Sequence, residues 1–184
     1  MTLYRAFAWD RGAANDKPDS PLWFPRVFQG EGRHDNPDVY GCLYLADRAV
    51  SCTVEQFAAF RGQRLIAGLL RRRGLPLALA TIHLDDDAVI LDLDDPVVLR
   101  RERLRPSLVA TRQREVTQPQ ALDLYRRHPR AAGLRWWSTW EARWANFTLF
   151  DRVAPLLRVD DVQELTLAHP AVAEAADLFG LRVM

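Results

Sequence analysis

Short apolar or alternating segments recur along the chain, and a hydrophobic period of two predicts strands that bury one face. The first is residues 3–9, where aromatic and aliphatic residues alternate with small or charged ones. Later segments that predict strands are residues 41–46, 75–84, 88–93, 133–138, 146–150 and 156–167. Strands therefore occur from the beginning of the chain to near its end.

Helical spacing replaces this alternation after residue 47. Val50, Val54 and Phe57 recur at intervals of three and four, which predicts a helix with one face toward the core. Asp47 precedes this helix and is predicted to cap its first backbone N–H groups. Gly62 is predicted to interrupt the helix.

Further helices are predicted at residues 65–73, which end before Gly74, at 117–127 with Thr117 as the cap, and at 170–178. Residues 10–40 are rich in Gly, Pro, Asn and Asp and predict a long functional loop. Because strands and helices are mixed without strict alternation, we expect an α+β fold.

The length and the net charge of the chain limit the classes of function that it can have. The chain has 184 residues and a formal net charge of +1, which favours one globular domain over residues 1–184 and gives no general attraction to nucleic acid or to an anionic membrane. The arginine-rich segments 71–73 and 100–105 alternate with the acidic segments 85–87 and 92–95. We interpret the basic segments as solvated faces, with a partner or nucleic-acid surface as the alternative.

Cys42 and Cys52 are the only cysteines, too few for a disulfide framework and without zinc-site spacing. Both lie among apolar residues, which predicts buried free thiols in a reducing cytoplasm. No apolar run reaches the ~20 residues of a membrane span, and no signal peptide is recognisable. We expect a soluble cytoplasmic protein.

Arg33, Tyr44 and Glu55 are the residues with the most informative chemistry. Arg33 follows a glycine in the long loop, where a guanidinium can bind a diphosphate, although a surface arginine is the ordinary alternative. Tyr44 lies in an apolar strand and can stack on a flat ligand, although most such tyrosines are core residues.

Glu55 lies within a mostly apolar helical stretch, where a carboxylate near the core needs a partner or a function. A fixed carboxylate can stabilise the cation that develops on ribose when nicotinamide leaves NAD. The alternative is an exposed helix glutamate.

The order of these residues resembles that of the RES domain, the toxin component of RES/Xre toxin–antitoxin systems. Tyr4 and Arg5 match its N-terminal strand, and residues 32–37 match its Gly-Arg-aromatic-Asn-Pro loop with one residue more, which predicts a bulge between Arg33 and Asn36. Residues 43–45 match its Leu-Tyr-Leu strand, and Glu55 its helix glutamate.

Residues 133–138 and 146–151 are similar to two later segments of that family, which makes Ser138 the candidate for its name-giving serine. The resemblance covers about residues 3–151, followed by a strand and helix within 156–179. It implies an ADP-ribosyltransferase-like fold with a split β-sheet around an NAD site and no metal.

The resemblance also implies an enzyme that degrades NAD as a glycohydrolase or phosphorylase, or transfers ADP-ribose to protein. Arg33, Tyr44, Glu55 and Ser138 would be catalytic, and Arg5 is a second candidate clamp for an anionic group. His34 could be an acid, a base or a phosphate contact, the alternative being an exposed loop histidine.

An Xre-like antitoxin is the implied partner, and the chain could form homo-oligomers or hetero-oligomers with it. A catalytically inactive RES-like binding module is the alternative from another class. The tryptophans at 136, 137, 140 and 144 are interpreted as core and site wall, with a partner surface or an adenine-stacking site as alternatives.

Overall fold

The computed structural model describes residues 1–183 and confirms the predicted α+β class. The chain divides into two compact units. The first unit consists of Met1–Trp23, Leu45–His83 and the residues from Arg158 onward, and the second of Phe24–Tyr44 and Leu84–Leu157.

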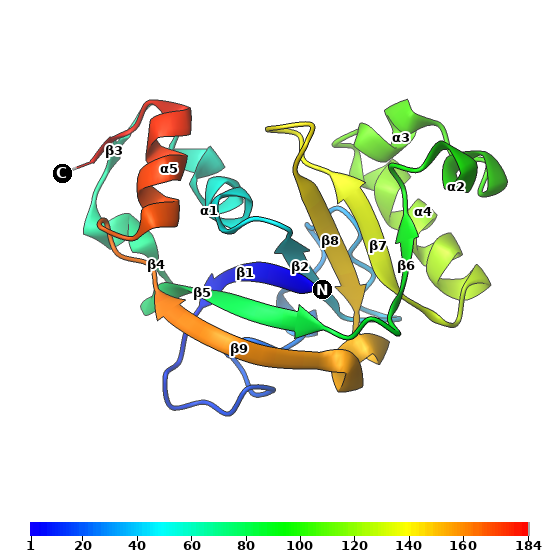
Figure 1. Cartoon of the computed structure of the whole chain (residues 1–184), viewed down its shortest axis with the longest axis horizontal. Helices are drawn as coiled ribbons and strands as arrows, with labels where there is room; N and C mark the ends of the chain where they lie inside the picture. The colour runs from blue at the N-terminus through cyan, green and yellow to red at the C-terminus, as the bar shows by residue number, and fades with distance from the viewer. Residues whose placement is uncertain (184) are drawn as a thin grey trace. The chain divides into compact units, whose positions relative to one another are not determined.

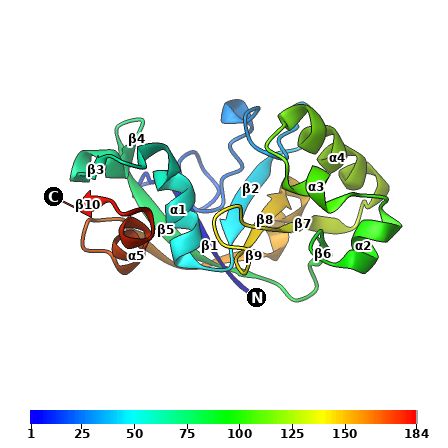
Figure 2. The ribbon, with the colours of Figure 1, turned by 90° about the horizontal axis from the view of Figure 1, so that it is seen from above.

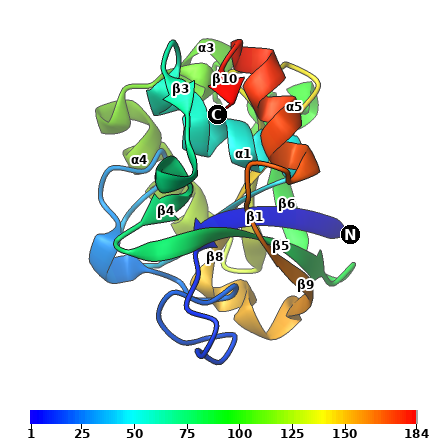
Figure 3. The ribbon, with the colours of Figure 1, turned by 90° about the vertical axis from the view of Figure 1, so that its left-hand side faces the viewer.

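The first unit is built on an antiparallel pair in which β1 (Thr2–Ala8) lies beside β5 (Leu75–Leu84). Leu3 is opposite Ile82 in this pair, and both side chains are buried. Strand β2 (Cys42–Ala46) ends beside β1. Strands β4 (Arg71–Arg72) and β9 (Leu157–Glu164) both pair with β5. Figures 1 and 3 show β1, β5 and β9 in succession.

Two amphipathic helices, α1 (Ala49–Phe57) and α5 (Pro170–Phe179), pack against each other in the first unit (Figure 1). Val54 and Phe57 are buried on α1, and Val172 on α5. The predicted helix 50–57 is confirmed, but its N-cap is Arg48 rather than Asp47.

The helix predicted over residues 65–73 is wrong. Leu65 instead lies in β3 (Arg64–Leu65), which pairs in parallel with β10 (Arg182–Val183), and its side chain is fully buried. The rest of the stretch forms one short 3-10 turn, η3 (Ala67–Leu70), and β4. Another 3-10 turn, η2 (Ala58–Phe60), precedes β3. Tertiary pairing of β3 with the end of the chain therefore overrides the local helical spacing.

In the second unit, β8 (Ala145–Phe150) lies antiparallel to β7 (Ala131–Trp137), and β7 lies parallel to β6 (Val89–Asp92). Strand β2 lies beside β8. The helices of this unit are α2 (Pro96–Arg101), α3 (Pro106–Ala110) and α4 (Arg114–Arg127), visible in Figure 2, with 3-10 turns η1 (Arg26–Phe28) and η4 (Asp151–Leu156).

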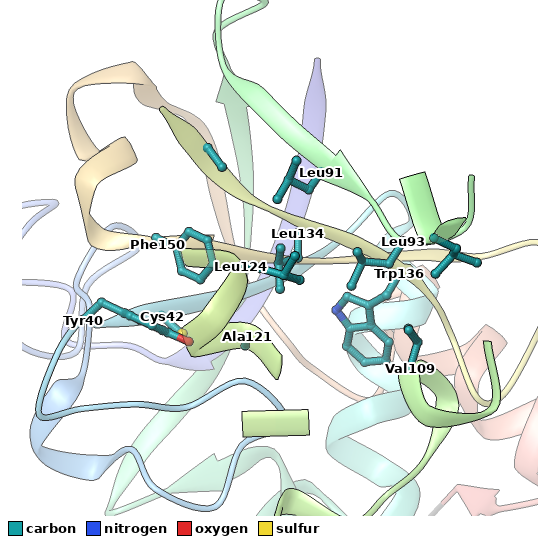
Figure 4. Close-up of a cluster of buried hydrophobic side chains, with 12 residues drawn as sticks. Tyr40, Cys42, Leu91, Leu93, Val109, Ala121, Leu124, Leu134, Trp136 and Phe150 are labelled. Carbon is teal, nitrogen blue, oxygen red and sulfur yellow. The ribbon is translucent and has the colours of Figure 1, made fainter. Parts of the chain in front are cut away.

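The core of the second unit lies between β7, β8 and α4 (Figure 4). Ala121 and Leu124 of α4 pack with Leu134 and Trp136 of β7. The ring of Tyr40 meets that of Phe150 at 4.8 Å. This apolar layer supports the loop that precedes β2, because Tyr40 is the anchor at the loop's end.

The predicted strands at residues 3–9, 41–46, 75–84, 88–93, 133–138, 146–150 and 156–167 and the helix at 170–178 are confirmed, with ends shifted by a few residues. Helix α4 ends as predicted but begins at Arg114, so Thr117 lies inside it rather than at its cap. Helices α2 and α3 were not predicted. Both cysteines are buried and carry free thiols, as expected.

Candidate functional site

The loop of residues 30–36 in the second unit is folded around the buried carboxylate of Asp35. Asp35 Oδ2 accepts hydrogen bonds from the backbone N–H groups of Gly30 at 2.8 Å and Gly32 at 2.7 Å. Its Oδ1 accepts from the hydroxyl of Tyr44 at 2.7 Å. Hydrogen bonds to a charged acceptor are stronger than neutral ones, so Asp35 fixes the backbone on both sides of Gly32.

The predicted bulge between Arg33 and Asn36 is a turn. The backbone N–H of Asp35 closes it on the carbonyl of Gly32 at 3.4 Å. Glycine is required at position 32, because a Cβ there would lie 2.5 Å from Asp35 Oδ1 and 2.5 Å from the Tyr44 hydroxyl. Neither atom can withdraw without losing their mutual hydrogen bond.

Arg33 projects from this turn into the second unit and is only 7% exposed. Its Nη1 donates to the carbonyls of Val109 at 2.9 Å and Thr111 at 2.5 Å. The guanidinium carbon lies 4.5 Å from the centroid of the Trp136 ring, a cation–π distance. These contacts hold the cation in one position, which favours its use in binding an anion.

His34 is buried rather than exposed, so the expectation of a solvent-exposed loop histidine is wrong. Its side chain is 3% exposed, with Nδ1 2.8 Å from Thr148 Oγ1 and the ring edge-to-face with Trp136 at 5.7 Å. Burial, together with the charges of Arg33 and Arg114, lowers the pKa of His34 to about 3. The imidazole is therefore neutral near pH 7, where it is too weak a base to take up a proton.

Tyr44 is half-buried in β2, and its hydroxyl group holds the loop. The hydroxyl accepts from the backbone N–H of His34 at 2.9 Å while it donates to Asp35. Burial, followed by the neighbouring Cys42 and Asp35, raises the pKa of the Tyr44 phenol well above its usual value, so the hydroxyl stays protonated.

Helix α4 holds the same loop from the other side. Thr117 donates its hydroxyl to the carbonyl of Arg33 at 2.6 Å. Gln118 donates its side-chain amide to the carbonyls of Gly30 at 2.8 Å and Gly32 at 2.9 Å. Burial removes water from the carbonyl groups of this loop, and hydrogen bonds from α4 take the place of that water.

Ser138 follows β7 in the second unit and is buried. Its hydroxyl oxygen accepts from the backbone N–H of Trp140 at 3.1 Å, and its own N–H donates to the carbonyl of Trp144 at 2.8 Å. These bonds shape the connection from β7 to β8. Trp136 is buried, and the other three tryptophans of this stretch are half-buried, which favours the core interpretation.

The two remaining candidates lie in the first unit. Arg5 is 7% exposed, and its Nη1 donates to the carbonyls of Ser20 at 3.0 Å and of Pro21. Burial lowers the pKa of Arg5 to about 9, although Cys52 and Asp19 oppose the shift. Glu55 lies on the exposed side of α1, as in the alternative of an exposed helix glutamate that the sequence left open.

The structure thus brings Arg33, His34 and Tyr44 together in one loop network of the second unit, while Arg5 and Glu55 belong to the first unit. A family model of the RES domain matches residues 2–169. The chain belongs to the RES domain family. No match was found among curated proteins.

A solved structure has the same fold. This RES domain is similar to a chain in the crystal structure of the M. tuberculosis MbcT–MbcA toxin–antitoxin complex, with a TM-score of 0.66 and 21% sequence identity. The similarity covers 98% of this chain and 89% of that chain. At this identity the similarity establishes the fold.

Sequence reasoning missed three residues that organise this part of the RES domain: Asp35, Thr148 and Gln118. Asp35 gave only a general signal, because an aspartate in a loop often bonds to neighbouring backbone N–H groups. Thr148 gave no signal, since its contact with His34 depends on how the loop of residues 30–36 packs against β8.

No group of three His, Cys, Asp or Glu side chains within residues 1–183 could hold a metal ion. No helix in the described part of the chain is long and apolar enough to cross a membrane.

Proposed function

We propose that this RES domain cleaves the bond between nicotinamide and ribose in NAD and acts as the toxin of a toxin–antitoxin pair. The observation that carries the proposal is the match of the RES domain over residues 2–169. The fold shared with a chain of a toxin–antitoxin complex supports the second part. The contacts around each candidate residue suggest a role in this reaction, and that role can be tested.

Arg33 binds the diphosphate of NAD in this proposal. Its support is the fixed position of the guanidinium between the carbonyls of Val109 and Thr111 and the ring of Trp136. A cation that is already in place when the substrate arrives loses little entropy on binding. Tyr44 contributes its ring as a platform for nicotinamide, while its hydroxyl remains bonded to Asp35.

Glu55 stabilises the ribosyl cation that forms as nicotinamide departs. A carboxylate near a developing positive charge can contribute several kcal/mol to a transition state. In the reaction the C1′–N bond of the nicotinamide ribose breaks, nicotinamide leaves as a neutral base, and a nucleophile forms the new bond to C1′. Ser138 is proposed to support this geometry, and Arg5 to bind a second anionic group.

The nucleophile that accepts the ADP-ribosyl group decides which of three activities the protein has. Water would make the protein a glycohydrolase, phosphate a phosphorylase, and a protein side chain an ADP-ribosyltransferase, because all three attack the same cation. We test them by incubating the full chain with NAD in water, with inorganic phosphate, and with a cell lysate, and by following nicotinamide and the ADP-ribose product. Absence of nicotinamide under all three conditions would contradict the proposal and leave the inactive binding module.

The proposed partner is an antitoxin, and the family resemblance suggests one of the Xre type. Expression of this chain alone is expected to stop growth with a fall in cellular NAD. Co-expression of a helix-turn-helix protein encoded beside it is expected to restore growth. Growth arrest without loss of NAD would contradict the proposed activity.

A further inference from the structure

Asp35 is a buried carboxylate without a counterpart in the family loop. Two residues, His34 and Asp35, lie between Arg33 and Asn36, where that loop has one aromatic residue. The ring of His34 takes the aromatic position, since it packs edge-to-face on Trp136 at 5.7 Å. Asp35 is therefore the additional residue of this chain, and the resemblance gives it no role.

The charge of Asp35 is balanced by hydrogen bonds alone. The residue is only 4% exposed, yet it forms no ion pair within residues 1–183. Three donors take the place of water around it: the backbone N–H groups of Gly30 and Gly32, and the hydroxyl of Tyr44. A buried carboxylate is costly unless such bonds hold it. The carboxylate therefore opposes any movement of these three donors.

Tyr44 is held at its hydroxyl by this carboxylate. The hydroxyl donates its single proton to Asp35 Oδ1 at 2.7 Å and accepts from the backbone N–H of His34 at 2.9 Å. These two bonds fix one end of the ring, and strand β2 fixes the other. Because the proton is already used, Tyr44 offers a bound substrate the face of its ring and not a hydroxyl donor.

The turn that carries Arg33 is held at the second oxygen. Asp35 Oδ2 accepts from Gly30 at 2.8 Å and from Gly32 at 2.7 Å, just before Arg33 in the chain. A Cβ on Gly32 would lie 2.5 Å from Oδ1 and 2.6 Å from Oδ2, so the carboxylate packs directly on this backbone. The two oxygens belong to one rigid group, and the ring of Tyr44 is thereby coupled to the turn of Arg33.

We propose that Asp35 is a positioning residue for NAD, because it couples the ring of Tyr44 to the turn that carries Arg33. The inference rests on the proposed function for the identity of the substrate, but the coupling itself does not. Only molecules in which the carboxylate holds both groups present the binding arrangement. The apparent affinity for each part of NAD scales with the fraction of such molecules, so a change at Asp35 alters both affinities by the same factor.

The coupling is tested first in the absence of NAD, by NMR of the full chain labelled with ¹³C at tyrosine Cζ and with ¹⁵N. Asp35→Asn keeps the shape but removes the charge, and should shift the Cζ resonance of Tyr44. Asp85→Asn is the matched control, because Asp85 is an exposed aspartate whose side chain accepts from the N–H of Asp87 at 2.9 Å. It should leave the Tyr44 resonance in place. An unmoved Tyr44 resonance in Asp35→Asn would overturn the inference.

Tyr44→Phe tests the coupling from the opposite end and leaves Asp35 in the chain. The variant removes one donor from Oδ1, so the carboxylate is held less firmly and the amide resonance of Gly30, which bonds to Oδ2, should shift. Tyr125→Phe in the same unit is the control and should leave that resonance unchanged. A Gly30 amide that does not move in Tyr44→Phe would also overturn the inference.

Ligand binding is measured by NMR titration with inorganic pyrophosphate and with nicotinamide, which probe Arg33 and Tyr44 separately. Asp35→Asn should weaken both affinities by the same factor, about tenfold if the held arrangement falls to about one tenth of the molecules. Asp85→Asn should change neither. A loss of affinity for one probe alone would overturn the inference, because the two groups would then be positioned independently. A wild type that binds neither probe would contradict the proposed NAD site, while the spectra of the free protein still decide the coupling.

The kinetics of NAD cleavage separate positioning from a general loss of folded protein. Saturating NAD selects the held arrangement, so Asp35→Asn should raise KM about tenfold and leave kcat per folded molecule within about threefold of the wild type. A lower kcat with an unaltered KM would overturn the inference. Shifted Tyr44 and Gly30 resonances without nicotinamide release from the wild type would contradict only the proposed NAD cleavage.

Discussion

Arg5 and Arg33 are two buried arginines with similar local contacts and different neighbours. Each is 7% exposed, and each donates through Nη1 to two backbone carbonyls. Each also lies near an aromatic ring, at 5.2 Å from Phe7 and 4.5 Å from Trp136. By burial and hydrogen bonding alone, neither is the better candidate for a ligand site.

The difference lies in what surrounds them. Arg33 is followed by the buried His34, and its turn is held by Asp35, Tyr44 and α4 through seven side-chain hydrogen bonds to the backbone of residues 30–34. Arg5 instead ties β1 to the carbonyls of Ser20 and Pro21. Polar side chains therefore fix the turn that carries Arg33, which makes Arg33 the stronger candidate for the main anion site, with Arg5 proposed for a second anionic group.

The largest expected effect is on activity, and it separates the two arginines. Arg33→Lys should lower kcat/KM for NAD cleavage about 100-fold, because lysine cannot reproduce both the stacking on Trp136 and the planar set of donors. Arg5→Lys should lower thermal stability and lower kcat/KM per folded molecule only about tenfold, because Arg5 is proposed to bind a second anionic group. Equal losses of kcat/KM in the two variants would show that Arg33 is no more important for activity than Arg5.

A smaller effect tests the turn beside Arg33. Gly32→Ala should lower the free energy of unfolding by about 3 kcal/mol, since its Cβ would displace the Asp35 carboxylate and the Tyr44 hydroxyl. Gly68→Ala is the control, because the nearest atom to its Cβ is Ile66 Cδ1 at an ordinary 3.9 Å. Urea denaturation of both variants measures the difference, and similar midpoints would show that the turn is not tightly packed.

The pH dependence of stability tests the burial of His34. Its pKa is about 3 in the folded protein against 6.5 for an ordinary histidine, so between these values the unfolded chain binds one more proton. Stability is then lost as pH falls below 6.5, by about 1.4 kcal/mol per pH unit. His34→Gln should flatten this slope between pH 6.5 and 4.5. An unchanged slope would mean that His34 titrates normally.

Glu102 is expected to add to the acid sensitivity at lower pH. Its burial raises the pKa of the carboxyl, but hydrogen bonds from Arg101, His128 and Arg127 outweigh burial and lower the pKa to about 2 from 4.5. The stabilisation is therefore present above pH 4.5 and lost as pH falls toward 2. Glu102→Gln should lower stability by a constant amount above about pH 4.5 and change the slope of stability against pH only below that value, which separates it from His34→Gln.

The smallest effect concerns the loop that Arg5 contacts. Ser20 donates its hydroxyl to the carbonyl of Asn15 at 2.7 Å, so Ser20→Ala should lower the unfolding free energy by about 1 kcal/mol. Nicotinamide release should remain at the wild-type rate. A large loss of activity in this variant would make the Arg5 loop part of the functional site.

The regular elements of the two units were largely predictable, because periodicity reports which face of a strand or helix is buried. Strand β1 follows this rule, since Leu3, Arg5 and Phe7 are buried while Tyr4 and Ala6 between them are only partly buried. The segment around Leu65 does not, since its conformation depends on pairing with residues at the other end of the chain. Such long-range pairing leaves no local pattern to read.

The candidate site was predictable only in part. The order of Arg33, Tyr44 and Glu55 in the chain identified the family, and the RES domain match over residues 2–169 confirms it. The burial of His34 and the exposure of Glu55 could not be read from the sequence, because each depends on how its element packs. Their roles in catalysis stay predictions.

The most direct test of the proposed activity compares two exposed helix glutamates of the first unit, Glu55 on α1 and Glu174 on α5. The initial rate of nicotinamide release from NAD is measured for the wild type, Glu55→Gln and Glu174→Gln at equal folded concentration. We predict that Glu55→Gln lowers the rate at least about 100-fold while Glu174→Gln leaves it unchanged. A Glu55→Gln protein that releases nicotinamide at the wild-type rate would contradict the assignment of Glu55 to the ribosyl cation.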